Sequence, residues 1–314
     1  MERSGGEEIT AADPHPHVAP SPTAAVPWSP WKALDLPHRF DAESLRETLD
    51  GGQAFRWRPV NNGTEWQGVF AQHAVQLRFA GTARPLEFRA ATDPAAAAEA
   101  LCSYLAMAAT LDTALSRLPL GSDSVLARAV AACPGLILLR QPFAETLLAF
   151  ILSSTKQIPQ IRQLCETLAA RFGAELAPGI HALPTWDRLA AVGEVELRRC
   201  ALGFRARYVH ETAQFLAVRP GWLARVEAAP YADAKVALCE LPGVGEKVAD
   251  CTLLFGAGRL EAFPVDVWIL RALAERYGLA GWKPAHLAQF GRVHFGALAG
   301  LAQQYLFTAV RQGR

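Results

Sequence analysis

The sequence predicts a protein of class α+β, in which a small antiparallel sheet domain is followed by a large α-helical domain. Residues 30–90 contain short segments in which apolar and polar residues alternate, as in half-buried strands. From Asp93 onward the apolar residues recur at helical spacing, and there is no internal repeat. We therefore expect a tail at 1–28, a sheet domain with its following helix at 29–135, and a helical domain at 136–314.

Composition and charge bound the class of protein. The 314 residues are 51% hydrophobic and 19% charged, as is typical of a soluble globular protein. The net charge of +1 gives no general evidence of nucleic-acid binding, but basic residues cluster locally. Six arginines lie at 198–225 against Glu211, and five lie at 271–314 against Glu275. These clusters fit contacts with phosphates, and ordinary solvated helix faces are the alternative reading.

The cysteines and the start of the chain indicate an intracellular protein. The six cysteines are scattered and none forms a Cys-x-x-Cys pair, which argues against a disulfide framework and against a zinc site. No apolar run is long enough to span a membrane, and the start lacks the pattern of a signal peptide. Residues 1–28 are rich in Pro, Ala, Ser, Gly and His, which predicts a disordered tail with His15 and His17 exposed to solvent.

The elements follow in order along the chain. Alternating segments predict strands at 55–60, 65–71, 73–81 and 86–90, with Asn61-Asn62-Gly63 as a hairpin turn between the first two. Asp93-Pro94 is a helix start, and the alanine-rich run that follows is helical. Further helices are expected at 122–133, 142–153, 157–172, 186–192, 194–202, 207–218, 231–240, 246–256, 266–277, 284–289 and 291–312.

The stretch Leu241–Cys251, LPGVGEKVADC, predicts a tight turn between two helices. Pro242 fixes φ, and Gly243 and Gly245 allow backbone conformations that are closed to other residues. The result is a helix–hairpin–helix. Its glycines let a partner approach the backbone, and the first N–H groups of its second helix suit a phosphate.

Two side chains after this turn can carry chemistry. Lys247 lies in the first turn of the second helix, where the dipole disfavours a cation and so favours the neutral amine of a nucleophile. Nineteen residues on (266 − 247), Asp266 follows Pro264-Val265 and is a natural N-cap of the next helix. Taken singly, Lys247 reads as a solvated lysine and Asp266 as a cap. Together, at this spacing behind the hairpin, they indicate a site.

A hairpin, a lysine and a Pro-Val-Asp at this spacing resemble the helix–hairpin–helix/Gly-Pro-Asp DNA glycosylases, and most closely the 8-oxoguanine DNA glycosylase/lyases. The segment at 51–57, GGQAFRW, resembles the family's GGQSFRW, and LGFRARY at 202–208 resembles its LGYRARY. The resemblance covers residues 30–314. It implies a twisted antiparallel sheet domain before a helical glycosylase domain, in a bifunctional enzyme that excises 8-oxoguanine and nicks the strand.

The resemblance also implies roles for individual residues. Lys247 would attack the sugar C1′ and hold it as a Schiff base, and Asp266 would stabilise positive charge developing on the sugar. A flipped base would be read by the carbonyl of Gly52 and by Gln303. It would stack between Phe307 and Cys251.

The contacts with DNA depart from the family pattern in places. Phe204 matches the aromatic wedge, and Arg205 would bond the cytosine opposite the lesion. The loop that usually reads SSNNN is SSTKQ here, so that Thr155 replaces the first Asn. Gln160 replaces an Arg expected to contact the cytosine, and Trp268 replaces a His that meets a phosphate.

The resemblance also bears on cofactors and partners. Backbone carbonyls of Cys239, Leu241 and Val244 match positions that hold a monovalent cation in such hairpins. Some relatives bind an iron–sulfur cluster through four closely spaced cysteines after the catalytic region, but no cysteine follows Cys251 here. We expect no other cofactor, no membrane, and a monomer that binds double-stranded DNA containing 8-oxoguanine inside the cell.

Two alternatives stay open from the sequence. The first is a glycosylase of the same superfamily for another lesion, such as alkylated purines, against which GGQAFRW and GFRARY argue. The second is a DNA-binding protein that uses the hairpin without catalysis, against which the joint presence of Lys247 and Asp266 argues.

Overall fold

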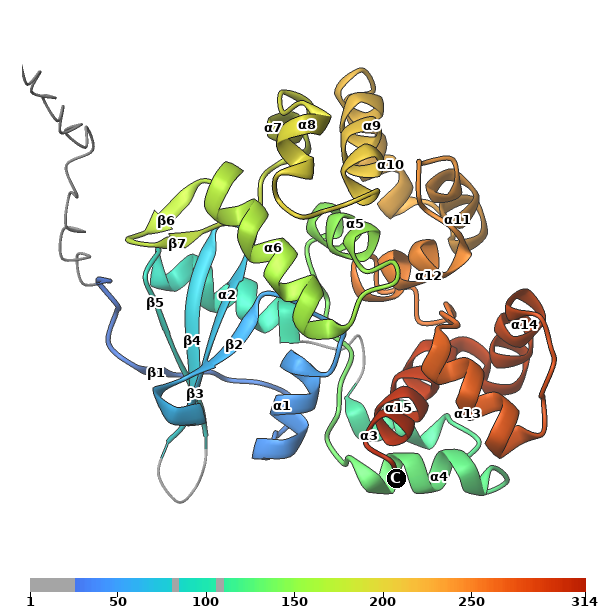
Figure 1. Cartoon of the computed structure of the whole chain (residues 1–314). Helices are drawn as coiled ribbons and strands as arrows, with labels where there is room; N and C mark the ends of the chain where they lie inside the picture. Colours follow the sequence, from blue (N-terminus) through green and yellow to red (C-terminus); the bar gives the residue numbers. More distant parts are fainter. Residues whose placement is uncertain (1–25, 81–84, 106–109) are drawn as a thin grey trace, which may run out of the picture.

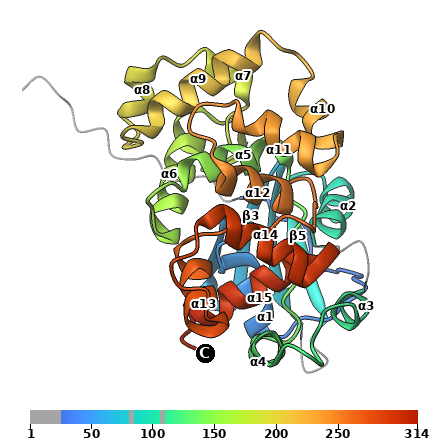
Figure 2. The ribbon, with the colours of Figure 1, turned by 90° about the vertical axis from the view of Figure 1, so that its right-hand side faces the viewer.

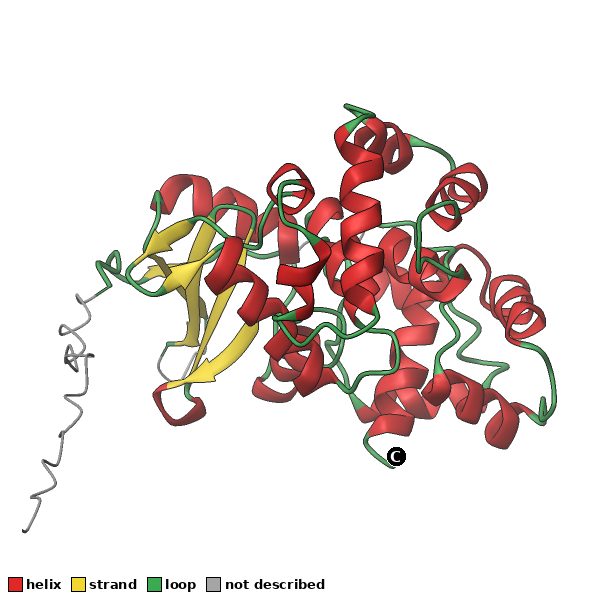
Figure 3. Cartoon of the chain, turned by 45° about the horizontal axis from the view of Figure 1, so that its top comes forward, coloured by secondary structure: helices red, strands yellow, loops and turns green. Residues whose placement is uncertain are grey.

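The computed structural model describes residues 26–80, 85–105 and 110–314, and it confirms the predicted α+β class. A small antiparallel sheet lies at one end, and the helical part fills the rest of the molecule (Figures 1 and 3). The predicted tail at 1–28, with His15 and His17, lies outside the described residues except for positions 26–28.

The five-stranded sheet has the order β1-β5-β4-β3-β2, and every pair is antiparallel. Four strands occupy the predicted segments, and the fifth, β1, is a two-residue edge strand. The 3₁₀ turn Asn61–Gly63 joins β2 and β3, with φ of 49°, 56° and 83° at its three residues, as asparagine and glycine allow. The strands are β1 Lys32–Ala33, β2 Trp57–Val60, β3 Glu65–Phe70, β4 His73–Phe79 and β5 Leu86–Ala90.

Helix α1, Ala42–Asp50, was not expected, and it lies within the region 30–90 that the sequence predicts to contain the sheet. Asp41 caps this helix by accepting the Ser44 N–H at 2.7 Å, and Ser44 Oγ accepts the Asp41 N–H in return. On one face of the sheet, α2 (Pro94–Leu105) packs against β4 and β5. Trp57 anchors this core by donating from Nε1 to Tyr104 Oη at 3.1 Å.

The helices follow the predicted order with four differences. Thr110 caps a separate helix, α3, within the run after Pro94 that was expected to be one helix. Helix α10 follows Gly221 and was not expected, and β6 and β7 form a small added hairpin. The last predicted break is misplaced, because α14 continues to Phe295 and the chain turns at Gly296, whose φ is 65°. The remaining elements are α3 Leu111–Ser116, α4 Ser124–Ala132, α5 Phe143–Leu152, α6 Ile158–Phe172, β6 Glu175–Ala177, β7 Ile180–His181, α7 Trp186–Ala190, α8 Glu194–Arg198, α9 Arg205–Ala217, α10 Trp222–Ala228, α11 Tyr231–Cys239, α12 Glu246–Phe255, α13 Val267–Tyr277, α14 Pro284–Phe295, the 3₁₀ turn Gly296–Leu298 and α15 Ala299–Arg311.

Helices far apart in sequence pack together and position the site. Helix α5 packs on α12, and the buried C-terminal helix α15 packs on α13 and on α4 (Figures 1 and 2). One hydrophobic core joins residues from Phe55 to Ala309, and a second lies under the sheet. As a result α6, α12, α13 and α15 meet beside the loop that follows α1.

The described residues contain neither a membrane-spanning helix nor a cluster of side chains that could bind a metal ion. None of the helices there is long and apolar enough to cross a membrane. No group of three or more His, Cys, Asp and Glu side chains among those residues could hold a metal ion.

Candidate active site

The predicted hairpin joins α11 to α12, and its two glycines differ. Gly243 has φ of 76°, and a Cβ built on it would meet Tyr208 Cδ2 at 2.3 Å, so only glycine fits. Gly245 has φ of −91° and open space around its Cβ position, which corrects the expectation that both positions require special backbone angles. Nothing inside the described protein therefore requires glycine at 245, and the open space lies at the N-terminus of α12.

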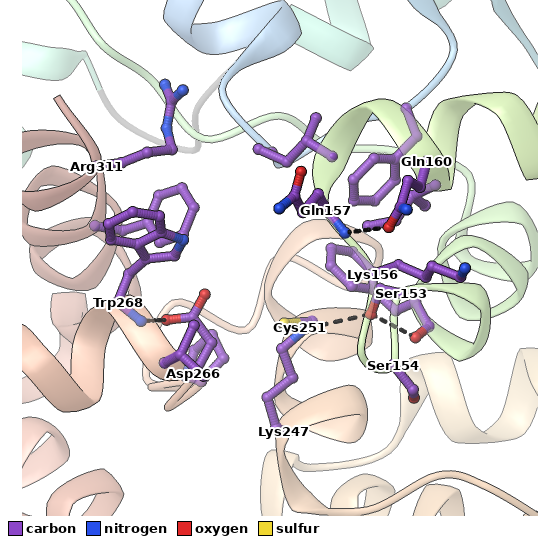
Figure 4. A pocket seen from close by; sticks show the side chains of 18 of the residues that line it. Ser153, Ser154, Lys156, Gln157, Gln160, Lys247, Cys251, Asp266, Trp268 and Arg311 are labelled. Atoms are coloured by element: carbon purple, nitrogen blue, oxygen red, sulfur yellow. Dashed lines mark hydrogen bonds between the residues drawn. The ribbon is translucent and has the colours of Figure 1, made fainter.

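Lys247 lies in the first turn of α12 and its amine is held near α5. Its Nζ donates to Ser153 Oγ at 3.4 Å and lies 5.1 Å from the centroid of the Phe150 ring. Ser153 in turn donates its hydroxyl proton to Phe150 O at 2.7 Å, which leaves Oγ as an acceptor toward the lysine. The contact therefore directs the amine toward the cavity (Figure 4).

Asp266 is the N-cap of α13, as predicted from its place after Pro264-Val265. Its Oδ1 accepts the N–H groups of Trp268 and Ile269 at 3.0 and 2.9 Å. Burial raises the pKa of this carboxyl, while the hydrogen bond from Ile269 and the charge of Lys247 oppose the rise. Figure 4 shows Asp266 and Lys247 on facing walls of one cavity.

That cavity has a volume of about 1010 Å³ and brings together most of the predicted site. The predicted residues that line it are Gly52, Thr155, Gln160, Lys247, Cys251, Asp266, Gln303 and Phe307. They come from the loop after α1, the loop before α6, and helices α6, α12 and α15, together with the turn before α13. A cavity of this size is large enough for a nucleobase.

The part of the cavity assigned to the base is tightly built. Gly52 has φ of 104°, and a Cβ on it would meet Ile158 Cδ1 at 3.0 Å and Phe307 Cζ at 3.4 Å. Gln303 is buried and its Oε1 has no hydrogen-bond partner in the described structure, so a polar ligand there would satisfy it. Burial raises the pKa of Cys251 to about 12, so its side chain remains a thiol at neutral pH.

Phe204 and Arg205 do not line the cavity, and they differ in exposure: Phe204 is exposed and Arg205 is buried. Phe204 is 48% exposed, as a wedge requires, and its ring meets Tyr208 edge-on. Arg205 is buried, with Nη2 donating to Ser154 O and, at 2.7 Å, to Thr155 Oγ1. Thr155 itself has φ of 55°, a left-handed conformation that a β-branched residue rarely adopts. The Nη2 group of Arg205 is therefore bonded within the protein, to the loop that precedes α6.

Gln160 has a local role that the sequence did not reveal. Its Oε1 accepts the Gln157 N–H at 3.1 Å and so caps α6. Trp268, which replaces the phosphate-binding His of the family pattern, lines the cavity beside Asp266 (Figure 4).

The carbonyls predicted to hold a cation flank the hairpin turn. Cys239 ends α11, and the carbonyl of Leu241 accepts the Val244 N–H at 3.1 Å. A set of backbone carbonyl oxygens is chemically suited to a hard monovalent cation.

Several cavity residues were missed by the sequence analysis. Ser153, the acceptor of the Lys247 hydrogen bond, lies in the SSTKQ loop and could have been marked by that motif. Lys156 also lines the cavity and brings a second lysine to it. Arg162 pairs with Asp50, and Arg311 pairs with the buried Glu47, contacts between segments that no local pattern links.

Comparisons with known proteins show which family this chain matches. Residues 148–291 match the HhH-GPD superfamily of base excision DNA repair proteins, and residues 38–147 match the N-terminal domain of 8-oxoguanine DNA glycosylase. An N-glycosylase/DNA lyase OGG1 of Arabidopsis thaliana is 31% identical over 296 residues, which are 89% of this chain and 80% of that protein. An N-glycosylase/DNA lyase of Saccharomyces cerevisiae is 31% identical over 280 residues, or 81% of this chain and 73% of the relative.

A solved structure shows the same fold. The crystal structure of a Clostridium acetobutylicum 8-oxoguanine glycosylase/lyase, bound to double-stranded DNA with cytosine opposite 8-oxoguanine, superposes with a TM-score of 0.79. It is 28% identical, and the match covers 86% of this chain and 92% of the other.

Proposed function

This chain belongs to the N-glycosylase/DNA lyase family of the HhH-GPD superfamily of base excision DNA repair proteins, and we propose that it excises 8-oxoguanine from DNA and nicks the strand at the resulting site. The observation that carries the proposal is the meeting of Lys247 and Asp266 on facing walls of one cavity that also contains Gly52, Gln303 and Phe307.

Lys247 is the proposed nucleophile. Its Nζ attacks as the neutral amine and forms a bond to C1′ of the flipped nucleotide as the bond from C1′ to the base breaks; the base leaves with that electron pair and takes up the proton that the amine loses. The sugar ring then opens at C1′ to give a Schiff base with the lysine. Loss of a proton from C2′ expels the 3′ phosphate by β-elimination, and water finally releases the enzyme. Ser153 holds the amine on the cavity side until the sugar arrives.

Asp266 is the proposed electrostatic partner of this reaction. Positive charge develops on the sugar as the base departs, and an ionised carboxylate in a partly buried position stabilises that charge strongly. The two N–H groups of α13 that bond Oδ1 hold the carboxylate in place and supply the helix dipole at its N-terminus.

Other residues that line the same cavity would select the base. 8-Oxoguanine carries N–H at N7 where guanine has an acceptor, so the carbonyl of Gly52 would accept from the lesion and repel the normal base. The amide of Gln303 would bond the Watson–Crick edge, and Phe307 and Cys251 would stack on the two faces of the ring. Their burial excludes water from these contacts.

The duplex would be held outside the cavity. We propose that the N-terminus of α12 and its hairpin bind the phosphate backbone, with a monovalent cation on the carbonyls of Cys239, Leu241 and Val244 adding positive charge. Phe204 would fill the space left by the flipped nucleotide, and Arg205 would bond the opposite base. One chain carries every residue named, so a monomer inside the cell, with its DNA, suffices.

An excision panel tests the proposal. Single-turnover reactions are run on duplexes that carry 8-oxoguanine, 3-methyladenine or an abasic site at one position. We expect release of 8-oxoguanine with nicking, and nicking at the abasic site. Release of the alkylated base alone would instead identify an alkylpurine glycosylase, and binding without any release would identify a non-catalytic DNA-binding protein.

A further inference from the structure

Gln53 directly follows Gly52, and its side chain anchors the segment of residues 52 and 53 to a distant part of the chain. Its side chain is fully buried. Its Nε2 donates to Ile137 O at 2.8 Å, and its Oε1 accepts the Leu139 N–H at 3.0 Å. A single amide group therefore makes the two bonds that a neighbouring strand would make, across more than eighty residues of sequence.

Gln141 extends this connection to the catalytic helix. Its Nε2 donates to the backbone carbonyl of Gln53 at 2.8 Å. Its own backbone N–H donates to Phe255 O at 2.8 Å, and Phe255 is the last residue of α12. Helix α12 carries Lys247 and Cys251. A run of hydrogen bonds through one intermediate residue thus joins the neighbour of Gly52 to the helix that holds the nucleophile.

We propose that Gln53 and Gln141 are positioning residues that fix the separation between Gly52 and α12, and that they thereby determine how strongly the enzyme prefers 8-oxoguanine to guanine. The inference rests on the proposed function, because it requires Gly52 to read N7. Both the attraction to the lesion and the repulsion of guanine depend steeply on the distance from that carbonyl.

Gly52 packs against two side chains on the side that faces away from the glutamines' hydrogen bonds. A Cβ on this glycine would lie 3.0 Å from Ile158 Cδ1 and 3.4 Å from Phe307 Cζ, so the segment already packs closely on that side. The glutamines therefore hold the segment against a wall that also stacks the base. Without them the segment loses its hydrogen bonds on the side away from Phe307, so the Gly52 carbonyl is no longer held at a fixed distance from the base.

The test compares three reactions of Gln53→Ala, Gln53→Glu and Gln141→Leu. They are excision of 8-oxoguanine opposite cytosine, excision of guanine in the same duplex during long incubations, and nicking at a preformed abasic site. We expect the rate of lesion excision to fall roughly tenfold or more, because buried hydrogen bonds that set the geometry are lost. The ratio of the excision rate of 8-oxoguanine to that of guanine should also decrease. Nicking at the abasic site needs Lys247 and no base, so it should stay near wild type.

The matched control is Gln76→Ala. Gln76 is also a buried glutamine with two side-chain partners, donating to Gln67 Oε1 at 3.0 Å and accepting from Arg89 Nε at 2.7 Å. It lies on β4 and does not line the cavity. We expect this control to lose stability and to keep the wild-type preference for the lesion. If Gln53→Ala fails to fold, Gln53→Glu, which keeps the contact with Leu139, and Gln141→Leu carry the test.

Two results would overturn the inference. One is that the folded variants keep the wild-type ratio of 8-oxoguanine excision rate to guanine excision rate. The other is a fall of excision and abasic nicking together in the Gln53 and Gln141 variants, by the same factor as in the control Gln76→Ala. That result would indicate a general loss of stability. A wild-type chain that nicks abasic DNA but excises no 8-oxoguanine would refute the proposed function instead, and this inference with it.

Discussion

The two hairpin glycines allow a matched pair of substitutions, Gly243→Ala and Gly245→Ala. At Gly243 the new Cβ would lie 2.3 Å from Tyr208 Cδ2, in a backbone with φ of 76°. The left-handed conformation costs an L-residue roughly 1–2 kcal/mol. Overpacking adds about 1–3 kcal/mol. Gly243→Ala should therefore lower the free energy of unfolding by about 2–5 kcal/mol, a large share of the stability of a domain.

Gly245→Ala should behave in the opposite way. The new Cβ meets no atom within 4 Å, and φ of −91° is open to alanine. The loss of a glycine N-cap should cost less than about 1 kcal/mol. The methyl group would stand where we expect a phosphate to approach α12, so DNA binding should weaken by about tenfold, or 1.4 kcal/mol.

Urea unfolding and DNA-binding titrations at several salt concentrations separate the two effects. A variant Gly245→Ala that binds duplex DNA as tightly as wild type would show that this end of α12 does not face the backbone. A variant Gly243→Ala as stable as wild type would refute the argument from Tyr208.

Three further predictions follow from the site and its surroundings. Asp266→Asn should lower single-turnover excision by orders of magnitude with little loss of stability, since Asn caps nearly as well. Because burial raises the Asp266 pKa, wild-type excision should fall as pH decreases through a value above that of an ordinary Asp, a limb that a pH–rate profile of the variant should lack. Gln160→Arg should increase the preference for cytosine over adenine opposite the lesion by about tenfold, at some cost to the cap of α6, and an unchanged ratio across the four opposite bases would show that position 160 does not read the opposite base. Burial raises the pKa of Glu145 to about 7, so the folded state favours its protonated form and stability should decline by up to about 3 kcal/mol as pH rises from 4.5 through 7; urea unfolding of Glu145→Gln should lack this decline.

The sequence predicts the fold well where a pattern is long. Alternation over five or more residues located four strands of the five-stranded sheet, and helical spacing located most helices. Helix α1 was missed because its signal is the short capping box of Asp41 and Ser44 within a region of strand-like composition. The break between α14 and α15 was misplaced because Gly296 adopts a positive φ at a position with no other breaker nearby.

The candidate site, like the fold, could be predicted only in part from the sequence. Lys247 and Asp266 could be predicted because each follows a turn with a fixed residue pattern, and the structure brings them to one cavity. The burial of Arg205 against Ser154 and Thr155 could not be predicted, since it depends on contacts fifty residues apart. The hydrogen bond from Gln53 to Ile137 could not be predicted either, because the two residues are far apart in the sequence.

Borohydride trapping on DNA containing 8-oxoguanine tests most directly the claim that the Lys247 amine is the nucleophile. A Schiff base is reduced to a stable covalent adduct, and only an amine of the protein can form one. Lys156, the other lysine of the cavity, supplies the matched control. The assignment of Lys247 as the nucleophile predicts that wild type and Lys156→Gln are trapped on lesion DNA, whereas Lys247→Gln binds the DNA and gives no adduct. An adduct formed by Lys247→Gln, or one lost in Lys156→Gln alone, would contradict it.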